Sequence, residues 1–137
     1  MKTDGVNPVI YLTTNQVIAI NTIQIKIYSP REQLGVKEPG LLDSALHRPK
    51  QSLFGNDAYP EIYGKAAALV ESLSMNHTFL NANKLTALAS LIIFLKLNSF
   101  KWTMDVEKEQ DFIVGIVNHV YPFQEIVSII KEHTVKI

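Results

Sequence analysis

Residues 85–95 constrain the fold more than any other part of the chain. They form the longest apolar stretch, broken only by Thr86 and Ser90 and flanked by Lys84 and Lys96. The stretch is far short of the ~20 residues that a helix needs to span a bilayer. Apolar residues lie on nearly every side of the helix that it predicts, and such a helix is enclosed by its neighbours. We therefore expect a helix buried at the centre of a globular domain.

The chain length of 137 residues predicts one domain, covering residues 1–137. An apolar content of 47% is enough for an ordinary core. The sequence contains no cysteine, which excludes structural disulfides and thiolate metal sites and is typical of a reducing compartment. Residues 1–8 lack the apolar run of a secretory signal peptide. We therefore expect a cytoplasmic protein.

The charges are balanced, with thirteen Lys and Arg against thirteen Asp and Glu. No net field then draws the molecule toward nucleic acid or an anionic membrane. We accordingly expect neither as a direct partner, and any bound anion must be held by a local site.

The first helix is predicted to begin after Thr13, which has capping-box spacing with Gln16. The apolar pattern that follows is mixed, because β-branched residues alternate as in a strand while others recur at helical spacing. The cap favours a helix. Its expected inner face consists of Val17, Ile20, Ile23 and Ile27.

Five further helices are predicted, at about residues 41–48, 60–76, 84–98, 106–119 and 123–132. Pro49 should end the first of these, and Pro60 fits the first position of the next. Residues 51–59 are expected to be irregular and residues 100–104 to be a short extended piece. The chain is therefore predicted to be an all-α domain without a sheet of consequence.

Residues 77–84 connect the third and fourth predicted helices. His77 ends the third helix, and Phe79 is a large apolar residue in a polar turn, so we expect it to plug into the core. Small or amide residues, which let a ligand approach the backbone, follow at Asn81, Ala82 and Asn83.

The start of the fourth helix predicts an anion site. A helix N-terminus offers unpaired N–H groups and a partial positive charge. Lys84 adds a full charge and Asn83 a side-chain donor, while His77 is a candidate general base near neutral pH. These residues suggest phosphate handling. The alternative is a turn with an exposed histidine, two asparagines and a solvated lysine, and the residues alone leave it open.

This segment resembles the signature of the Fic/Doc family, whose Doc ("death on curing") branch reads His-x-Phe-x-(Asp or Asn)-(Ala or Gly)-Asn-Lys-Arg. The matching residues are His77, Phe79, Asn81, Ala82, Asn83 and Lys84. Further Doc-like sequence occurs at residues 40–49, 54–55, 59–60, 86–88 and 95–98. The resemblance covers nearly the whole chain and implies a Fic/Doc-type bundle of about six helices around a buried central helix.

For the Doc branch, the resemblance implies a toxin that transfers a phosphoryl group from ATP to a hydroxyl of elongation factor Tu and is neutralised by a Phd-like antitoxin. His77 would be the catalytic base. Ala82, Asn83 and Lys84 would bind the phosphates of ATP. Asn81 would lie beside the phosphate-bound Mg²⁺, although a neutral amide binds this ion less strongly than a carboxylate. Lys84 replaces the glycine of AMP-transferring relatives, which favours phosphoryl transfer.

One position departs from the Doc pattern, because Leu85 stands where the family has an arginine. Leucine cannot replace a planar, charged phosphate donor. Losing such a contact commonly costs about 2–4 kcal/mol in the transition state. Two alternatives therefore stay open: a Fic-type AMP transferase, and a catalytically inactive Doc-like protein that binds a partner such as an antitoxin helix.

The stretch 51–59, with Arg48 and Lys50 beside it, could by resemblance form a flap that holds the target segment. Solvated surface charges are the alternative interpretation of both residues. Trp102 is expected to belong to the core. The three other histidines show no metal-ligand spacing and are expected at the surface or at helix ends: His47, His119 and His133.

Overall fold

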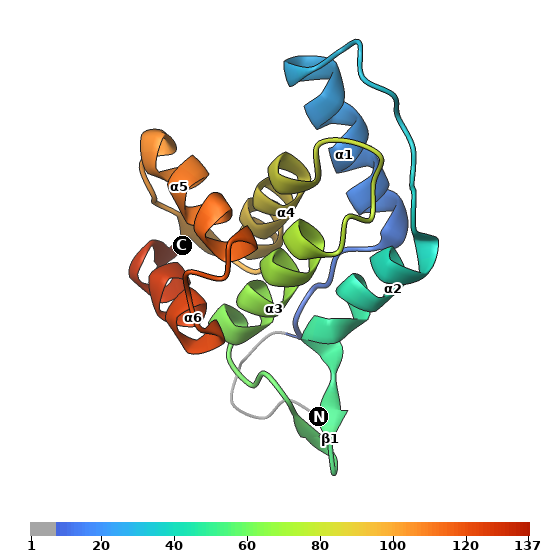
Figure 1. Ribbon diagram of the computed structural model, residues 1–137. Coiled ribbons are helices and arrows are strands. Elements are labelled where there is room, and N and C mark those ends of the chain that lie inside the picture. The colour runs from blue at the N-terminus through green and yellow to red at the C-terminus, as the bar shows by residue number, and fades with distance from the viewer. Residues whose placement is uncertain (1–7) are drawn as a thin grey trace.

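A computed structural model describes residues 8–137. In this part the chain forms α1 (Thr14–Tyr28), α2 (Pro39–His47), the 3-10 helix η1 (Arg48–Lys50), α3 (Ile62–Met75), α4 (Asn83–Leu97), α5 (Val106–Val117) and α6 (Phe123–Glu132). The predicted mostly helical bundle is confirmed (Figure 1). None of the described helices is both long and apolar enough to cross a membrane. The expectation about a signal peptide rests mainly on residues 1–7, which lie outside the described residues.

The helix at the centre of the bundle is α3, which contacts α2, α4, α5 and α6. Ala66, Ala67 and Ala68 on α3 are fully buried, and such small side chains let neighbouring helices approach from several directions. The expectation that residues 84–98 form the enclosed helix is wrong in this respect. Leu85 and Ile93 on α4 are 38% and 37% exposed. Because α4 carries apolar residues on nearly every side, its sequence did not show which side is exposed to solvent.

Helix α1 begins as predicted, with the capping box at Thr13 present. Val17 and Ile20 are buried as predicted, but the second half of the predicted inner face is not. Asn21 and Ile25, one turn apart, are buried, whereas Ile23 and Ile27 are 53% and 63% exposed. The spacing of apolar residues did not identify this face, because the face includes the polar Asn21, which forms hydrogen bonds inside the core.

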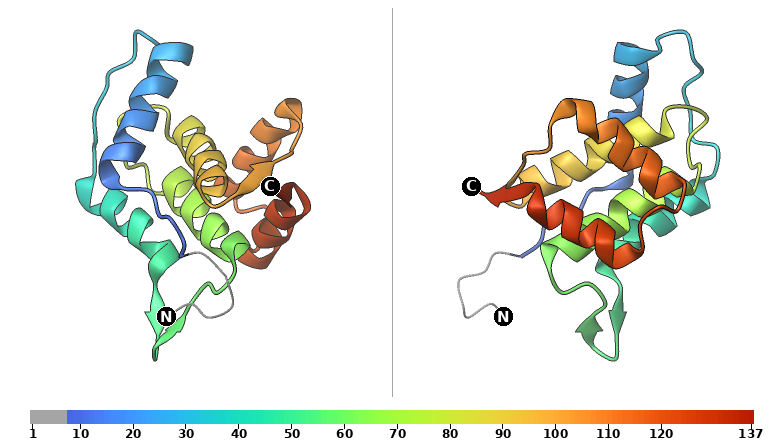
Figure 2. Two further views of the ribbon diagram at one scale, coloured as in Figure 1. Left: turned by 180° about the vertical axis from the view of Figure 1, so that it is seen from behind. Right: turned by 60° about the vertical axis from the view of Figure 1, so that its left-hand side comes forward.

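Residues 51–59 are not irregular but contain an antiparallel hairpin of β1 (Ser52–Leu53) and β2 (Asn56–Asp57). The hairpin lies at the N-terminal end of α3, and the α3–α4 loop lies at the opposite end (Figures 1 and 2). A helix of 14 residues is roughly 21 Å long. The stretch that could by resemblance form a flap holding the target segment thus lies at the opposite end of α3 from residues 77–84.

Two helix starts differ from prediction. Helix α2 begins at Pro39, because this proline rather than a later residue occupies the first turn. Pro60 precedes Glu61, the N-cap of α3, so this proline is outside the helix that it was expected to open. The end of α2 agrees with prediction, because the helix stops at His47, shortly before Pro49, which lies in the separate 3-10 helix η1.

The extended piece after α4 is confirmed as β3 (Phe100–Trp102), and it pairs antiparallel with β4 (Thr134–Lys136). This pairing joins the end of the described chain to the end of α4. The indole of Trp102 packs 5.9 Å from the ring of Phe112 and donates to Glu109 at 2.8 Å. Trp102 is thus packed against the core, as expected.

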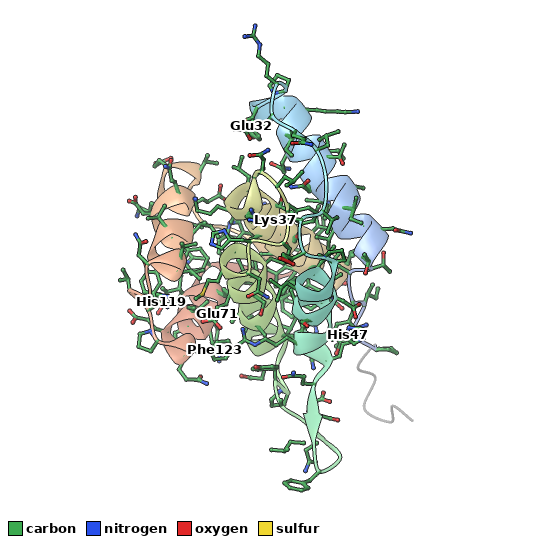
Figure 3. All side chains as sticks on the ribbon, turned by 45° about the vertical axis from the view of Figure 1, so that its right-hand side comes forward. Glu32, Lys37, His47, Glu71, His119 and Phe123 are labelled. Carbon is green, nitrogen blue, oxygen red and sulfur yellow. The ribbon has the colours of Figure 1, made fainter. Side chains whose placement is uncertain are left out.

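Arg48 is not a solvated surface charge, because it joins three helices. Its guanidinium donates to Glu71 on α3 at 2.7 Å and to the Tyr59 hydroxyl at 3.0 Å, and it lies 5.2 Å from the ring of Phe123 on α6. Figure 3 labels Glu71 and Phe123 on these neighbouring helices. Burial opposes the charged form, but the hydrogen bonds to Tyr59 and Glu71 outweigh it and raise the pKa of Arg48. The positive charge of Arg48 therefore stabilises the packing of η1 against α3 and α6.

Candidate functional site

The α3–α4 loop is anchored at its middle by Phe79. This side chain is 2% exposed and belongs to the main apolar core, as its sequence position predicted. His77, two residues earlier, is exposed and has a left-handed backbone with φ of 51°. The loop therefore exposes the imidazole of His77 at the surface, while the side chain of Phe79 is fixed in the core.

The segment 33–38, which leads into α2, holds the loop along one side. The Lys37 N–H donates to the Thr78 carbonyl at 2.8 Å, and the Leu80 N–H donates to the Gly35 carbonyl at 3.1 Å. Figure 3 labels Lys37 on this segment, beside the end of the bundle where α3 and α4 meet. Residues 33–38, and not residues 51–59, are thus the segment that borders the loop.

Asn83, the first residue of α4, closes the loop. Its Oδ1 accepts from the Phe79 N–H at 2.9 Å, and its Nδ2 donates to the Phe79 carbonyl at 3.0 Å. Sequence reasoning expected this side chain to bind phosphate. An amide nitrogen carries two protons, so only the second one is left for a ligand.

Ala82 is the N-cap of α4 and has a left-handed backbone, with φ of 62° and ψ of 35°. A left-handed residue followed by a helical one turns successive N–H groups toward a common point, which forms an anion-binding nest. The groups concerned are the N–H groups of Ala82, Asn83 and Lys84. The last two belong to the first turn of α4 and have no intrahelical partner. The predicted anion site therefore has a second geometric basis besides the helix end.

Lys84 is exposed, and no ion pair involves it among residues 8–137. The imidazole of His77 likewise forms no hydrogen bond or ion pair in this part of the chain. Neither side chain therefore has a polar partner among the described residues.

Asn81 offers little to a metal ion. Its Nδ2 donates to the Gln33 carbonyl at 3.0 Å, which leaves Oδ1 as its one candidate ligand atom. No group of three or more His, Asp or Glu side chains that could hold a metal occurs within residues 8–137.

Leu85 lines a groove of about 630 Å³ between α1, α4 and α5. Its lining is mainly apolar, with Lys84 at one end, and includes Tyr28, Leu88, Ile92, Val106 and Ile113. Tyr28 is 63% exposed and Val106 is 78% exposed. An apolar surface of this kind is typical of a protein-binding site.

Sequence reasoning missed Asn21. This residue of α1 is 2% exposed, and its Nδ2 donates to the Asn81 carbonyl at 2.9 Å and to the Thr86 hydroxyl at 3.0 Å. The available signal was that Asn21 lies four positions after Val17 and four before Ile25, on one side of the first helix.

The other three histidines lie apart from the site, as expected. Figure 3 shows His47 and His119 on opposite sides of the bundle. The Nδ1 atom of His133 lies 2.8 Å from the Ile129 carbonyl, at the end of α6. None of them joins His77.

Comparison with known proteins agrees with this geometry. A family model described as the Fic/DOC family matches residues 11–95, which contain the α3–α4 loop and more than half of the chain. The chain is also similar to the protein named Toxin Doc from Mycolicibacterium smegmatis (strain ATCC 700084 / mc(2)155), with 41% identity over 83 residues. The aligned part covers 59% of this chain and 64% of the relative, so the chain spans less than two thirds of the relative's length.

Proposed function

Because the chain belongs to the Fic/DOC family, we propose that it is a Doc-type toxin that transfers a phosphoryl group from ATP to a hydroxyl group of elongation factor Tu. The observation that carries this proposal is the nest of N–H groups at Ala82, Asn83 and Lys84, close in sequence to the exposed His77. The toxin would act in the cytoplasm, where translation takes place, and a Phd-like antitoxin would neutralise it.

The chemistry of phosphoryl transfer requires positioning and charge stabilisation more than covalent catalysis. The nest would bind oxygens of the transferred phosphoryl group, whose negative charge it neutralises in part. Lys84 adds a full positive charge at the same place. These donors are fixed before ATP binds, because Asn83 and Phe79 already hold the loop. Such preorganised donors stabilise a transition state at little cost in reorganisation.

His77 would act as the general base. Its imidazole takes the proton of the target hydroxyl while the hydroxyl oxygen attacks the γ-phosphorus of ATP. The bond from that phosphorus to the bridging oxygen of ADP breaks, and ADP leaves with the electron pair. The products are a phosphorylated hydroxyl, ADP and a proton held by His77.

Mg²⁺, when bound with ATP, would neutralise phosphate charge. The residues of this chain offer it the Oδ1 atom of Asn81, and the phosphates and water would supply the other ligands. We accordingly propose a nucleotide-held ion with Asn81 as a minor ligand.

Phosphoryl transfer is preferred over AMP transfer because Lys84 stands where AMP-transferring relatives have glycine. A direct test incubates the protein with elongation factor Tu, Mg²⁺ and ATP labelled at either the α- or the γ-phosphate. Label from the γ-phosphate alone supports the proposal. Label from the α-phosphate supports AMP transfer, and no label from either, with the natural protein and with Leu85→Arg, removes both activities.

One observation favours a second candidate, a protein that acts by binding. Leu85 replaces a phosphate ligand of the family and contributes instead to the apolar groove between α1, α4 and α5. The groove runs along two turns of α4 from Lys84 to Ile92, which suits an amphipathic helix of a partner such as an antitoxin. Tight ATP binding that is lost in Lys84→Met would count against this candidate.

A further inference from the structure

We infer that Asn21 is a positioning residue that sets the direction of the Ala82 N–H group in the anion nest. The inference rests on the proposed function, because it explains how this chain prepares its phosphate site. Asn21 lies on α1, sixty positions before the residue whose carbonyl it binds.

The peptide that joins Asn81 to Ala82 has its orientation set by α1. In a planar trans peptide the C=O and N–H groups point in opposite directions. The Asn81 carbonyl accepts from Nδ2 of Asn21 at 2.9 Å, on the side of α1. The N–H of Ala82, in the same peptide, must then point away from α1. One buried hydrogen bond therefore determines where the first donor of the nest points.

The next peptide, which joins Ala82 to Asn83, is held by a hydrogen bond within α4. The Ala82 carbonyl accepts from the Thr86 N–H at 2.9 Å, which directs the Asn83 N–H away from the body of the helix. Nδ2 of Asn21 also donates to the hydroxyl of Thr86 at 3.0 Å. Asn21 thus contacts both the residue before the left-handed turn and the residue that closes its first helical bond.

The left-handed turn needs such support. A left-handed conformation costs an L-residue with a Cβ atom about 1–2 kcal/mol, and Ala82 has no side-chain polar group to offset it. Asn21 is 2% exposed, so its amide cannot exchange these bonds for water without opening the core. The orientation of the atoms is also unambiguous, because a carbonyl can only accept and the atom facing Asn81 must be Nδ2.

The test compares Asn21→Leu with a matched control, Asn98→Leu. Asn98 also ties a segment near the N-terminus to α4, with bonds of 2.8 and 2.9 Å to Ile10, but at the other end of that helix. The full chain is titrated with inorganic sulfate and followed by the NMR signals of the Ala82 amide and the Asn81 carbonyl. Sulfate is chosen because its charge is the same at acid and neutral pH.

We expect Asn21→Leu to shift the Asn81 carbonyl signal before any sulfate is added and to weaken sulfate binding roughly tenfold, equal to about 1.4 kcal/mol. Asn98→Leu should lower the melting temperature but leave sulfate affinity unchanged. The inference is overturned if Asn21→Leu binds sulfate like the natural protein, or if both variants lose affinity equally.

If Asn21→Leu does not fold, Asn21→Asp provides the test. A protonated carboxyl group can donate to the Asn81 carbonyl, whereas a carboxylate cannot. With His77→Ala introduced into both proteins, so that no imidazole lies in the loop, sulfate affinity should recover as the pH falls in Asn21→Asp but not in the protein that keeps Asn21. An affinity without this pH dependence would overturn the inference.

The outcome is separable from that of the proposed function. Absence of phosphoryl transfer with a normal sulfate response at Ala82 would remove the proposed activity and leave the role of Asn21 intact. A natural protein whose Ala82 amide does not respond to sulfate would overturn the role of Asn21, whatever the transfer assay gives.

Discussion

The side-chain amide of Asn83 bonds both backbone groups of Phe79, with Oδ1 accepting at 2.9 Å and Nδ2 donating at 3.0 Å. These two bonds join the start of α4 to the one apolar loop residue that is buried in the core. The backbone between them includes the left-handed Ala82. The shape of the anion nest therefore depends on a contact that no ligand needs to make.

Asn83→Asp should destabilise the fold and the site together. The carboxylate keeps the acceptor for the Phe79 N–H but replaces the donor to the Phe79 carbonyl with a like-charged oxygen. We expect a loss of about 1–3 kcal/mol in the free energy of unfolding, measured with urea, together with weaker ATP binding. The exposed Asn118→Asp serves as control and should change stability by less than about 0.5 kcal/mol. Equal effects of the two would contradict the closing role of Asn83.

Lys84→Met should weaken ATP binding without destabilising the protein. The Lys84 side chain is exposed, and no ion pair involves it among residues 8–137, so the fold loses little. Calorimetric titration should show about a tenfold or greater loss of affinity and a smaller salt dependence. Lys96→Met, near the other end of α4, is the matched control. Unchanged ATP affinity in Lys84→Met would argue against a phosphate at this helix end.

Leu85→Arg should raise the transfer rate and reduce binding in the apolar groove. The position is 38% exposed, so an arginine fits without burying its charge. Restoring a charged phosphate donor is expected to raise the rate about 10²-fold. Leu85→Lys, which adds the charge without a bidentate geometry, should give a smaller gain. A rate that stays the same in both variants would show that residue 85 is too far from the phosphates to matter.

Phe79→Ala should unfold the loop before it unfolds the protein. Removing a buried phenyl ring from the core costs about 3–5 kcal/mol. Hydrogen exchange of the loop amides should accelerate at temperatures at which α3 remains protected, and ATP binding should be lost. Phe54→Ala is a control because Phe54 is 94% exposed at the hairpin tip. Protection of the loop that is unchanged by Phe79→Ala would show that the hydrogen bonds alone maintain it.

Local signals in the sequence predicted the elements well. The capping box at Thr13 identified the start of α1, and residues 123–132 form α6 as expected. The buried position of Phe79 followed from its being a large apolar residue in a mostly polar turn. Such features depend on neighbours along the chain, which a sequence displays directly.

Features that depend on distant contacts were not predictable in the same way. Residues 51–59 were expected to be irregular, although residues 52–57 form a hairpin, because the pairing of such short strands leaves little pattern in the sequence. Asn83 was expected to face a ligand, although it bonds to Phe79. Asn21 was overlooked because its partners lie on the α3–α4 loop and α4.

We propose that His77 and the nest at Ala82 together catalyse the transfer of a phosphoryl group from ATP to elongation factor Tu. The most direct test of this proposal is the intact mass of elongation factor Tu after incubation with ATP, Mg²⁺ and either the natural protein, His77→Ala or Leu85→Arg. We expect the mass to increase by one phosphate with the natural protein, to increase faster with Leu85→Arg, and to stay unchanged with His77→Ala. An added AMP, or an unchanged mass with both the natural protein and Leu85→Arg, would contradict it.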